Sequence, residues 1–230
     1  MAHRFYTNLP LMRGELVLDG PEAHHLAAVS RHRVGDHVIL FNGDGADYLA
    51  EICDLHKRQV VLQVVEKKEV NREIGFRLEV AAPVPKGDRG DFLIEKLTEL
   101  GVTHFVPLQT VRSVVQPRET KLDRLRQKVI EASKQCGRNV MMIIEPLAEW
   151  GEYCRAPRES RRFIAHPGGV RWGGLRGMDV TFAIGPEGGF TDEEVALAVQ
   201  SGWERLDLGE RLLRIETAAL MVAALAIGES

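Results

Sequence analysis

In residues 180–200 a short apolar run is followed directly by a glycine-rich turn and then by a helical pattern. The run VTFAI is typical of a buried strand, and Thr191 with Glu194 three residues later predicts the capped start of a helix. A strand that passes through a tight turn into a helix is the building block of a parallel sheet. This order therefore limits the C-terminal part of the chain to α/β architectures.

The same alternation begins near residue 76. We predict strands in FRLEVAAPVPK (76–86), THFVPLQT (103–110), RRFIAHPGG (161–169) and ERLDLG (204–209). We predict helices in DRGDFLIEKLTELGV (88–102), TKLDRLRQKVIEASKQCGR (120–138), TDEEVALAVQSG (191–202) and the apolar stretch before residue 228. The alternation predicts one α/β domain with a mostly parallel sheet over residues 73–230.

The first 72 residues have a different texture, with short β-branched runs and tight turns. Strands are predicted in ELVLDG (15–20), DHVILFNGDGADYLAEICDL (36–55) and QVVLQVVEKKE (59–69), with a hairpin turn at residues 42–45. A proline near the first turn predicts a short helix over 21–29. Residues 1–72 are therefore expected to form a small β-barrel domain.

Composition excludes several classes of protein. The 230 residues are 44% hydrophobic and 27% charged, as in ordinary globular chains. No segment approaches the roughly 20 apolar residues of a membrane span, and the N-terminus lacks a signal-peptide core. The three cysteines form no CxxC pair, and the histidines near residue 25 complete no ligand spacing. We expect a cytoplasmic protein with no membrane segment, disulfide framework or metal site.

Basic residues concentrate in two segments, although the net charge is −3. Residues 112–138 hold eight basic and three acidic residues, and residues 155–176 hold six arginines and one acid. Such segments are consistent with a basic face that meets phosphates. They are equally consistent with two solvated faces whose acidic partners lie elsewhere.

Three predicted loops that leave strand ends are candidates for a binding site: residues 166–169, 185–189 and 208–214. Ligands of parallel sheets bind at the carboxyl ends of the strands, and glycine lets the backbone approach a ligand closely. The chain has neither a P-loop nor a GxGxxG motif, so these fingerprints of nucleotide binding are missing. The alternative for 185–189 is a plain turn before the capped helix.

The third segment carries two arginines beside a predicted helix start, where the helix dipole disfavours cations. Arg211 and Arg214 flank two leucines there, and Glu216 follows. Their placement suggests a partner such as RNA phosphate or a developing negative charge. The alternative is a salt bridge of these arginines with Glu210 or Glu216.

AIGPEGGFTDEE (183–194) together with LGERLLRIETAAL (208–220) resembles the paired motifs of SPOUT RNA methyltransferases. Within that superfamily the chain is similar to the family that methylates N3 of a uridine in 16S ribosomal RNA. EAHHLAAVSRHRVGD (22–36), KGDRGDFLIEKLTELGV (86–102) and EASKQCGR (131–138) also resemble this family. Two stretches differ from its pattern: LDRLRQKV (122–129), where an arginine–tryptophan pair is expected, and RNVMMII (138–144), where a proline is expected.

The resemblance implies a PUA-like RNA-binding barrel over residues 1–72 and a SPOUT domain with a deep trefoil knot over 73–230. It implies a homodimer with each site near the subunit interface, S-adenosylmethionine as cofactor, and 16S ribosomal RNA within the small ribosomal subunit as substrate. Arg214, Glu216 and Arg138 are the catalytic candidates, with Glu187 a further candidate to orient groups or accept the proton. Cofactor contacts are expected from His166, Pro167, Ile184, Gly185, Pro186, Glu187, Gly188, Gly189, Leu208, Gly209, Leu212, Leu213, Thr217 and Ala218. RNA contacts are expected from Arg4, His25, Arg31, Arg33, Arg112 and Arg211.

The activity implied is methylation of uracil N3 in 16S ribosomal RNA. Two alternatives stay open. One is a ribose 2'-O-methyltransferase of the same superfamily, and the other is an RNA-binding assembly factor that has lost activity. The three glycine-containing segments argue against the second alternative, because an inactive protein has no need of a cofactor site.

Overall fold

The computed structural model describes residues 3–29, 32–114, 116–174 and 177–228. The chain forms two compact units. The N-terminal unit comprises residues 1–73 and 133–141, and the C-terminal unit comprises residues 74–132 and 142–230. The predicted boundary near residue 72 is therefore incomplete, because residues 133–141 also belong to the first unit.

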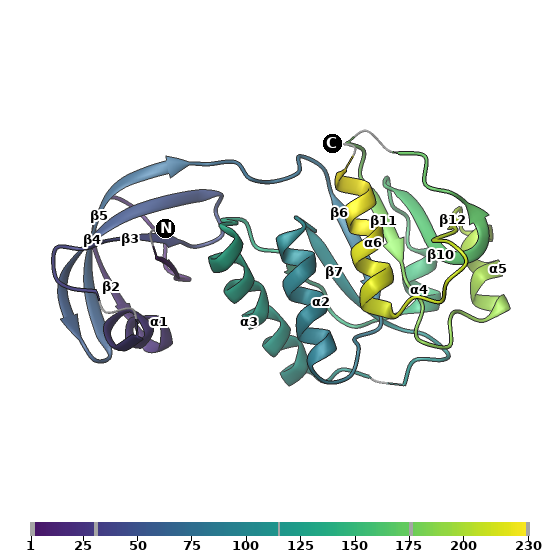
Figure 1. Cartoon of the computed structure of the whole chain (residues 1–230), viewed down its shortest axis with the longest axis horizontal. Helices are drawn as coiled ribbons and strands as arrows, with labels where there is room; N and C mark the ends of the chain where they lie inside the picture. Colours follow the sequence, from purple (N-terminus) through teal and green to yellow (C-terminus); the bar gives the residue numbers. More distant parts are fainter. Residues whose placement is uncertain (1–2, 30–31, 115, 175–176, 229–230) are drawn as a thin grey trace. The chain divides into compact units, whose positions relative to one another are not determined.

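The N-terminal unit contains a five-stranded sheet in the order β1-β3-β4-β5-β2 (Figure 1). Its strands are β1 (Arg4–Tyr6), β2 (Gly14–Asp19), β3 (His37–Phe41), β4 (Ala46–His56) and β5 (Gln59–Glu69). The predicted hairpin is confirmed, because β3 and β4 pair antiparallel across residues 42–45. The predicted helix is split into α1 (Gly20–His24) and the π-helical turn η1 (His25–Val29).

Asp47 ties residues 133–141 into the N-terminal unit. Its buried carboxylate accepts hydrogen bonds from Arg4 at 2.9 and 3.0 Å, from Arg72 at 3.1 Å, and from the Asn139 side chain at 3.3 Å. Burial alone would raise the pKa of Asp47, but the hydrogen bonds and charges of Arg4 and Arg72 outweigh it and hold the pKa below its usual value. This unit therefore uses arginines as internal supports as well as on its surface.

The C-terminal unit is built on a parallel sheet in the order β12-β10-β11-β6-β7-β8, with β9 paired to β7. Its strands are β6 (Leu78–Ala82), β7 (His104–Gln109), β8 (Ile143–Ile144), β9 (Ala148–Glu149), β10 (Arg161–Val170), β11 (Val180–Ala183) and β12 (Glu204–Leu206). β6 and β11 are buried at every position, as expected for strands covered on both faces. The predicted parallel α/β architecture is confirmed.

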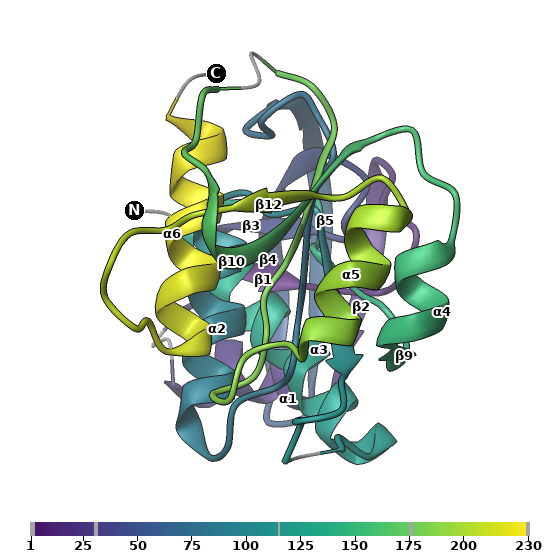
Figure 2. The same ribbon diagram turned by 90° about the vertical axis from the view of Figure 1, so that its right-hand side faces the viewer.

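Helices cover both faces of this sheet. α2 (Asp88–Glu99) and α6 (Ile215–Ile227) pack together on one face, and α4 (Trp150–Arg155) and α5 (Asp192–Gln200) lie on the other (Figure 2). α3 (Glu119–Cys136) begins in the C-terminal unit, and its last turn belongs to the N-terminal unit. Aromatic residues of α4, with Phe190 and Trp203, form much of the core on the α4–α5 side. No helix within the described ranges is long and apolar enough to cross a membrane.

The start of α5 follows the sequence prediction closely. The Thr191 side chain accepts a hydrogen bond from the Glu194 N–H at 3.2 Å, and the Glu194 carboxylate accepts one from the Thr191 N–H at 2.8 Å. This reciprocal pair is the predicted capping box. It fixes the exit of the Gly185–Gly189 turn, and Gly189 adopts the positive φ of +68° that the turn requires.

Residues 166–169 differ from the prediction of a loop after a strand. β10 continues through them to Val170 and pairs with β12 on both sides of an irregularity between Ala165 and Val170. A side chain at Gly169 is impossible, because its Cβ would lie 2.3 Å from the Arg205 carbonyl oxygen and 2.4 Å from the Arg205 carbonyl carbon. Glycine is therefore needed here because two backbone segments approach each other closely.

Candidate cofactor pocket and its surroundings

One pocket of the C-terminal unit brings the three predicted segments together. It lies beside residues 165–167 of β10 and at the carboxyl ends of β11 and β12, and it measures about 150 Å³. The predicted residues that line it are His166, Pro167, Ile184, Gly185, Pro186, Glu187, Gly189, Leu208, Gly209, Leu212, Leu213 and Ala218. Gly188 and Thr217 are not among the lining residues. Ala165, Asp207 and Arg211 complete the lining, and none of these three was predicted to contact the cofactor.

Asp207 connects the first and third segments. Its carboxylate accepts a hydrogen bond from the Gly209 N–H at 2.8 Å and one from the Gly168 N–H at 3.3 Å. Its own backbone N–H donates to the Val170 carbonyl at 2.8 Å. Gly209 adopts a φ of +102°, a conformation that favours glycine. Asp207 thus fixes the distance between the first and third segments of the pocket. The sequence feature that could have indicated this role is an acidic residue directly before Leu208 and Gly209.

Arg112 stabilises the second segment, residues 185–189, by a hydrogen bond to its backbone. Its guanidinium donates a hydrogen bond to the Gly188 carbonyl at 2.6 Å, and a Cβ on Gly188 would lie 3.3 Å from the Arg112 side chain. Gly188 thus contacts Arg112, and it does not face the pocket. These contacts favour a structural use of Arg112 over the predicted RNA contact. Sequence could not reveal the pairing, because the two residues lie 76 positions apart.

The catalytic candidates have different environments. Arg214 is exposed and forms the N-terminal cap position of α6, directly after the pocket residue Leu213. Glu216 is buried in the first turn of that helix, and one carboxylate oxygen lies 3.8 Å from Arg89. Among the described residues, no ion pair joins Arg214 to Glu216 or Glu210. The salt-bridge alternative for this loop therefore finds no support here.

Arg138 lies in the N-terminal unit. Its buried guanidinium donates hydrogen bonds to the Glu73 carboxylate at 3.1 and 2.5 Å. A buried arginine paired in this way stabilises residues 133–141 against the rest of its unit. A catalytic role for Arg138 stays a prediction, which these contacts do not favour.

The residues of the N-terminal unit that were predicted to contact RNA fall into two groups, one engaged within the protein and one exposed. Arg4 is only 11% exposed at its side chain, pairs with Asp47 and lies 4.7 Å from the centre of the Phe41 ring. These contacts favour an internal role for Arg4. His25 and Arg33 are exposed, so their predicted RNA contacts are sterically open. Arg31 lies outside the described residues. Arg211 lines the pocket of the C-terminal unit.

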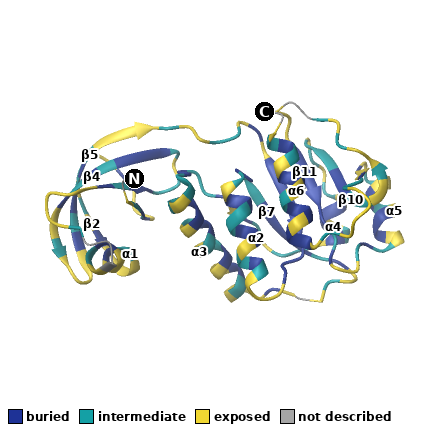
Figure 3. Ribbon diagram, in the orientation of Figure 1, coloured by how far each residue is buried: buried dark blue, intermediate teal, exposed yellow. Residues whose placement is uncertain are grey.

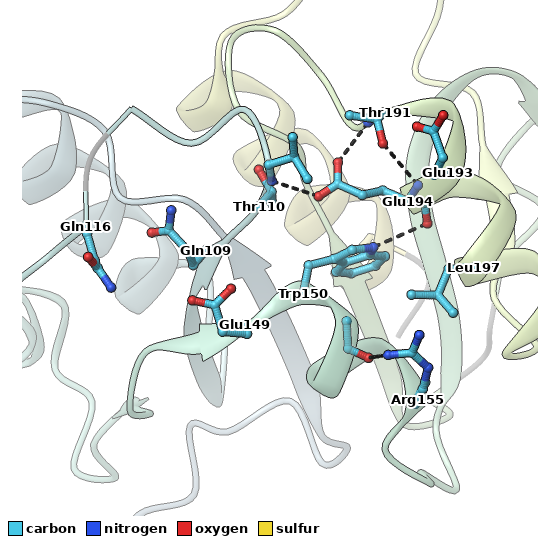
Figure 4. A pocket seen from close by; sticks show the side chains of 12 residues that line it. Gln109, Thr110, Gln116, Glu149, Trp150, Arg155, Thr191, Glu193, Glu194 and Leu197 are labelled. Carbon is cyan, nitrogen blue, oxygen red and sulfur yellow. Dashed lines mark hydrogen bonds between the residues drawn. The ribbon is translucent and has the colours of Figure 1, made fainter.

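A larger hollow of about 890 Å³ lies between β7, α4 and α5 (Figure 4). Its central polar groups are engaged within the protein. The Glu194 carboxylate accepts hydrogen bonds from the Val111 and Thr191 N–H groups at 2.9 and 2.8 Å, and the Trp150 indole donates to the Glu194 carbonyl at 3.2 Å. The hollow is larger than the pocket beside β10, β11 and β12, but it is the poorer candidate for a ligand site. The Glu194 carboxylate and the Trp150 indole are already engaged in hydrogen bonds within the protein.

We expect Glu194→Ala to lower the free energy of unfolding by about 1–3 kcal/mol, because the Val111 and Thr191 N–H groups lose their acceptor. Thr191→Ala should cost about 1 kcal/mol through loss of the cap. Gln200→Ala, an exposed change at the other end of α5, serves as the control. The midpoints of urea unfolding measure all three, and equal midpoints for Glu194→Ala and Gln200→Ala would contradict this account.

Comparison with known proteins agrees with this architecture. Residues 72–227 match the family model of the RNA methyltransferase domain, and residues 18–65 match that of the RNA methyltransferase PUA domain. The chain therefore belongs to the RNA methyltransferase family that carries an N-terminal PUA domain.

The relatives have a more specific description. Ribosomal RNA small subunit methyltransferase E of Rickettsia conorii is 31% identical, over 96% of this chain and 93% of the relative. The protein of the same name from Bacillus subtilis is 29% identical, over 88% of this chain and 86% of the relative.

Two solved structures are similar along almost the whole chain. The Neisseria gonorrhoeae ribosomal RNA small subunit methyltransferase E, bound to S-adenosylmethionine, has a TM-score of 0.90 and 29% identity, and covers 97% of this chain and 96% of its own. A Legionella pneumophila protein in complex with the same cofactor has a TM-score of 0.92 and 33% identity, and covers 98% of this chain and 96% of its own.

Proposed function

We propose that this chain is an S-adenosylmethionine-dependent methyltransferase that modifies 16S ribosomal RNA in the small ribosomal subunit, at N3 of one uridine. The observation that carries the proposal is the pocket that residues of all three predicted segments line together. The relatives named ribosomal RNA small subunit methyltransferase E support the substrate class. A substrate of this kind also implies that the protein works in the cytoplasm.

The lining of the pocket fits the chemistry of S-adenosylmethionine. Apolar residues such as Leu208 and Leu213 offer packing to an adenine ring, and bare glycine backbone offers N–H and C=O groups to its edge. The Glu187 carboxylate is an acceptor for the ammonium group of the cofactor and can attract its sulfonium, and Arg211 can pair with the cofactor's carboxylate. The cofactor supplies the electrophilic methyl group, and the protein must orient the acceptor and remove its proton.

The acceptor nitrogen develops negative charge as its proton leaves. A cation placed near that charge lowers the barrier, because the field is present before the reaction begins. Arg214 is the best-placed candidate, since it is exposed, belongs to the third segment and follows a pocket residue directly. In this proposal Glu216 acts indirectly, because it is buried against Arg89.

We also propose the trefoil knot of the SPOUT fold for the C-terminal unit. Its support is the close approach of two backbone segments at Gly169, where an added Cβ would meet Arg205 and Leu206 backbone atoms within 2.8 Å. Segments that approach this closely beside a ligand pocket are consistent with a threaded loop. The N-terminal unit, with its exposed His25 and Arg33, is proposed to bind RNA.

A homodimer is part of the proposal, and α6 supports it. Apart from Glu216 and Thr217, every residue of the helix is apolar, yet only one side is buried (Figure 3). The outward side carries Met221, Ala224 and Thr217, and Leu212 in the preceding loop is 99% exposed. A helix that is apolar all round normally has no solvent-facing side. A second copy of the chain would cover it.

We expect Met221→Lys to shift the protein from dimer to monomer, because the lysine would place a charge in the apolar contact. Val199→Lys is the matched control, since Val199 is an exposed apolar residue of α5 with 51% exposure. Light scattering coupled to size exclusion measures both masses. A dimeric Met221→Lys protein, or a wild type that is monomeric at all concentrations, would exclude this face as the interface.

The experiment that tests the proposed function is nucleoside mass spectrometry of ribosomal RNA. Ribosomal RNA from a strain that lacks the gene should lose 3-methyluridine, and the purified protein should restore it on isolated small subunits. Loss of a 2'-O-methylated nucleoside would favour the ribose methyltransferase. Loss of no modification, with calorimetry showing no cofactor binding, would favour the inactive assembly factor.

A further inference from the structure

A second cavity adjoins the proposed cofactor pocket at Pro186 and Glu187. It also measures about 150 Å³, and both cavities share Pro186 and Glu187. Its walls come from the segment after β6, the loop after β7 and the start of α6: Pro83, Val84, Pro85, Val114 and Ile215. Lys86 and Glu187 contribute the charged groups of its lining. We call this cavity the proline slot.

The walls of the proline slot suit a flat, mostly apolar ring. Pro83 and Pro85 have no backbone N–H, and Val84, Val114 and Ile215 offer only methyl groups from their side chains. A phosphate needs several donors around it, and these walls lack them. A heterocyclic base instead gains from apolar contact on its face while it needs only one or two polar partners at its edge.

The two charged groups match the edge of uracil. Uracil presents an N3–H donor between two carbonyl acceptors. The Glu187 carboxylate is an acceptor, and the Lys86 ammonium is a donor. Cytosine has a lone pair at N3, which a carboxylate would repel. The slot therefore has the polarity needed to prefer uracil over cytosine.

Glu187 is held by a charged neighbour. One carboxylate oxygen lies 3.5 Å from the Arg89 guanidinium, and Arg89 also lies 3.8 Å from the buried Glu216 carboxylate. The Glu187 side chain is half exposed and lines both cavities, and the contact with Arg89 restricts its rotation. Of the two acids, Glu187 lines both cavities, whereas Glu216 is not among the lining residues of either.

We propose that the proline slot binds the acceptor uracil, with Glu187 accepting the hydrogen bond of N3–H and Lys86 donating to a ring carbonyl. The inference rests on the proposed function, because it takes uracil N3 as the methyl acceptor. It adds the subsite and the two residues that recognise the base. Since Glu187 belongs to both cavities, the nitrogen bound to it lies next to the cofactor pocket.

The test compares two exposed valines of one loop. Val114 lines the slot and is 71% exposed, whereas Val111 is 76% exposed and lines the larger hollow. Val114→Phe should fill the slot and lower single-turnover methylation of small ribosomal subunits at least about tenfold, a typical effect of pocket shape on discrimination. Val111→Phe should stay within about twofold of wild type, and both variants should bind S-adenosylmethionine with wild-type affinity by calorimetry.

Equal rates for the Val114→Phe and wild-type proteins would contradict the binding of uracil in the proline slot, while the proposed function would stand. If the wild type does not methylate uridine, the proposed function fails. A binding measurement then still tests whether the proline slot binds uracil. Uridine 5'-monophosphate, added with S-adenosylhomocysteine, should shift the NMR methyl signals of Val84 and Ile215. Cytidine 5'-monophosphate should shift them less, and equal or absent shifts with both nucleotides would overturn the inference.

Discussion

Arg214→Ala is expected to lower the maximal single-turnover rate of methyl transfer about a hundred- to a thousandfold, which corresponds to roughly 3–4 kcal/mol of barrier. Arg214 is exposed at the N-terminal cap position of α6, where the helix dipole disfavours a cation. No ion pair with Glu210 or Glu216 is found among the described residues to explain it. We propose that the cation at this position meets a negative charge that forms only during the reaction.

The rate should be slow at every concentration of small subunits, because the lost interaction is made in the transition state. Arg214→Lys should recover only part of the rate, since the planar fork of the guanidinium is lost. Arg211→Ala is the matched control from the same loop. Because Arg211 lines the cofactor pocket, its removal should weaken cofactor binding and leave the saturated rate closer to wild type.

An Arg214→Ala protein with the wild-type maximal rate and weaker RNA binding would make Arg214 a phosphate contact. The charge-stabilising role would then pass to another cation of the C-terminal unit. Lys86 of the proline slot would be the first to test, because it lines the cavity that we assign to the base.

The sequence was sufficient where local chemistry determines structure. Thr191 and Glu194 predicted the capping box of α5, and the three segments that were singled out by their glycines line one pocket, two of them at the ends of β11 and β12. In both cases the partners lie within a few residues or follow from the edge geometry of a parallel sheet. The joint motifs predicted the family, which the comparisons confirm.

The sequence was insufficient where the partner lies far along the chain. Arg112, Arg138 and Arg4 were each expected to meet RNA or substrate, and each is engaged by a distant group of its own unit. The Arg112 and Gly188 contact spans 76 positions, and the Arg138 and Glu73 contact spans 65. Charge counts cannot distinguish an arginine that supports a loop from one that binds a phosphate.

Gly188 illustrates the same limit. Sequence reasoning treated the glycines of residues 185–189 as equivalent, yet their environments differ. Gly188 contacts Arg112, Gly189 has a positive φ of +68°, and Gly185 lies against Phe190. A substitution at Gly188 would therefore test the Arg112 support, and the cofactor pocket is better tested at Gly185.

Gly185→Val is expected to weaken S-adenosylmethionine binding by about 5- to 150-fold. Gly185 lines the cofactor pocket, and a Cβ there would lie 3.0 Å from the Phe190 nitrogen and 3.2 Å from the Gly189 carbonyl carbon. Those atoms belong to the turn itself, so the turn must open to admit the side chain. Overpacking of this kind costs about 1–3 kcal/mol, which sets the expected loss of affinity.

Calorimetric titration with S-adenosylmethionine measures the effect, and urea unfolding checks that the Gly185→Val protein is folded. The matched control is Gly173→Val, because a Cβ at Gly173 meets no atom within 4 Å and its φ lies outside the left-handed region. Gly173 is not among the residues that line the cofactor pocket, so the control should bind the cofactor like wild type. A folded Gly185→Val protein with the affinity of Gly173→Val would show that the Gly185–Gly189 turn does not form the cofactor site. The pocket would then have to serve another ligand.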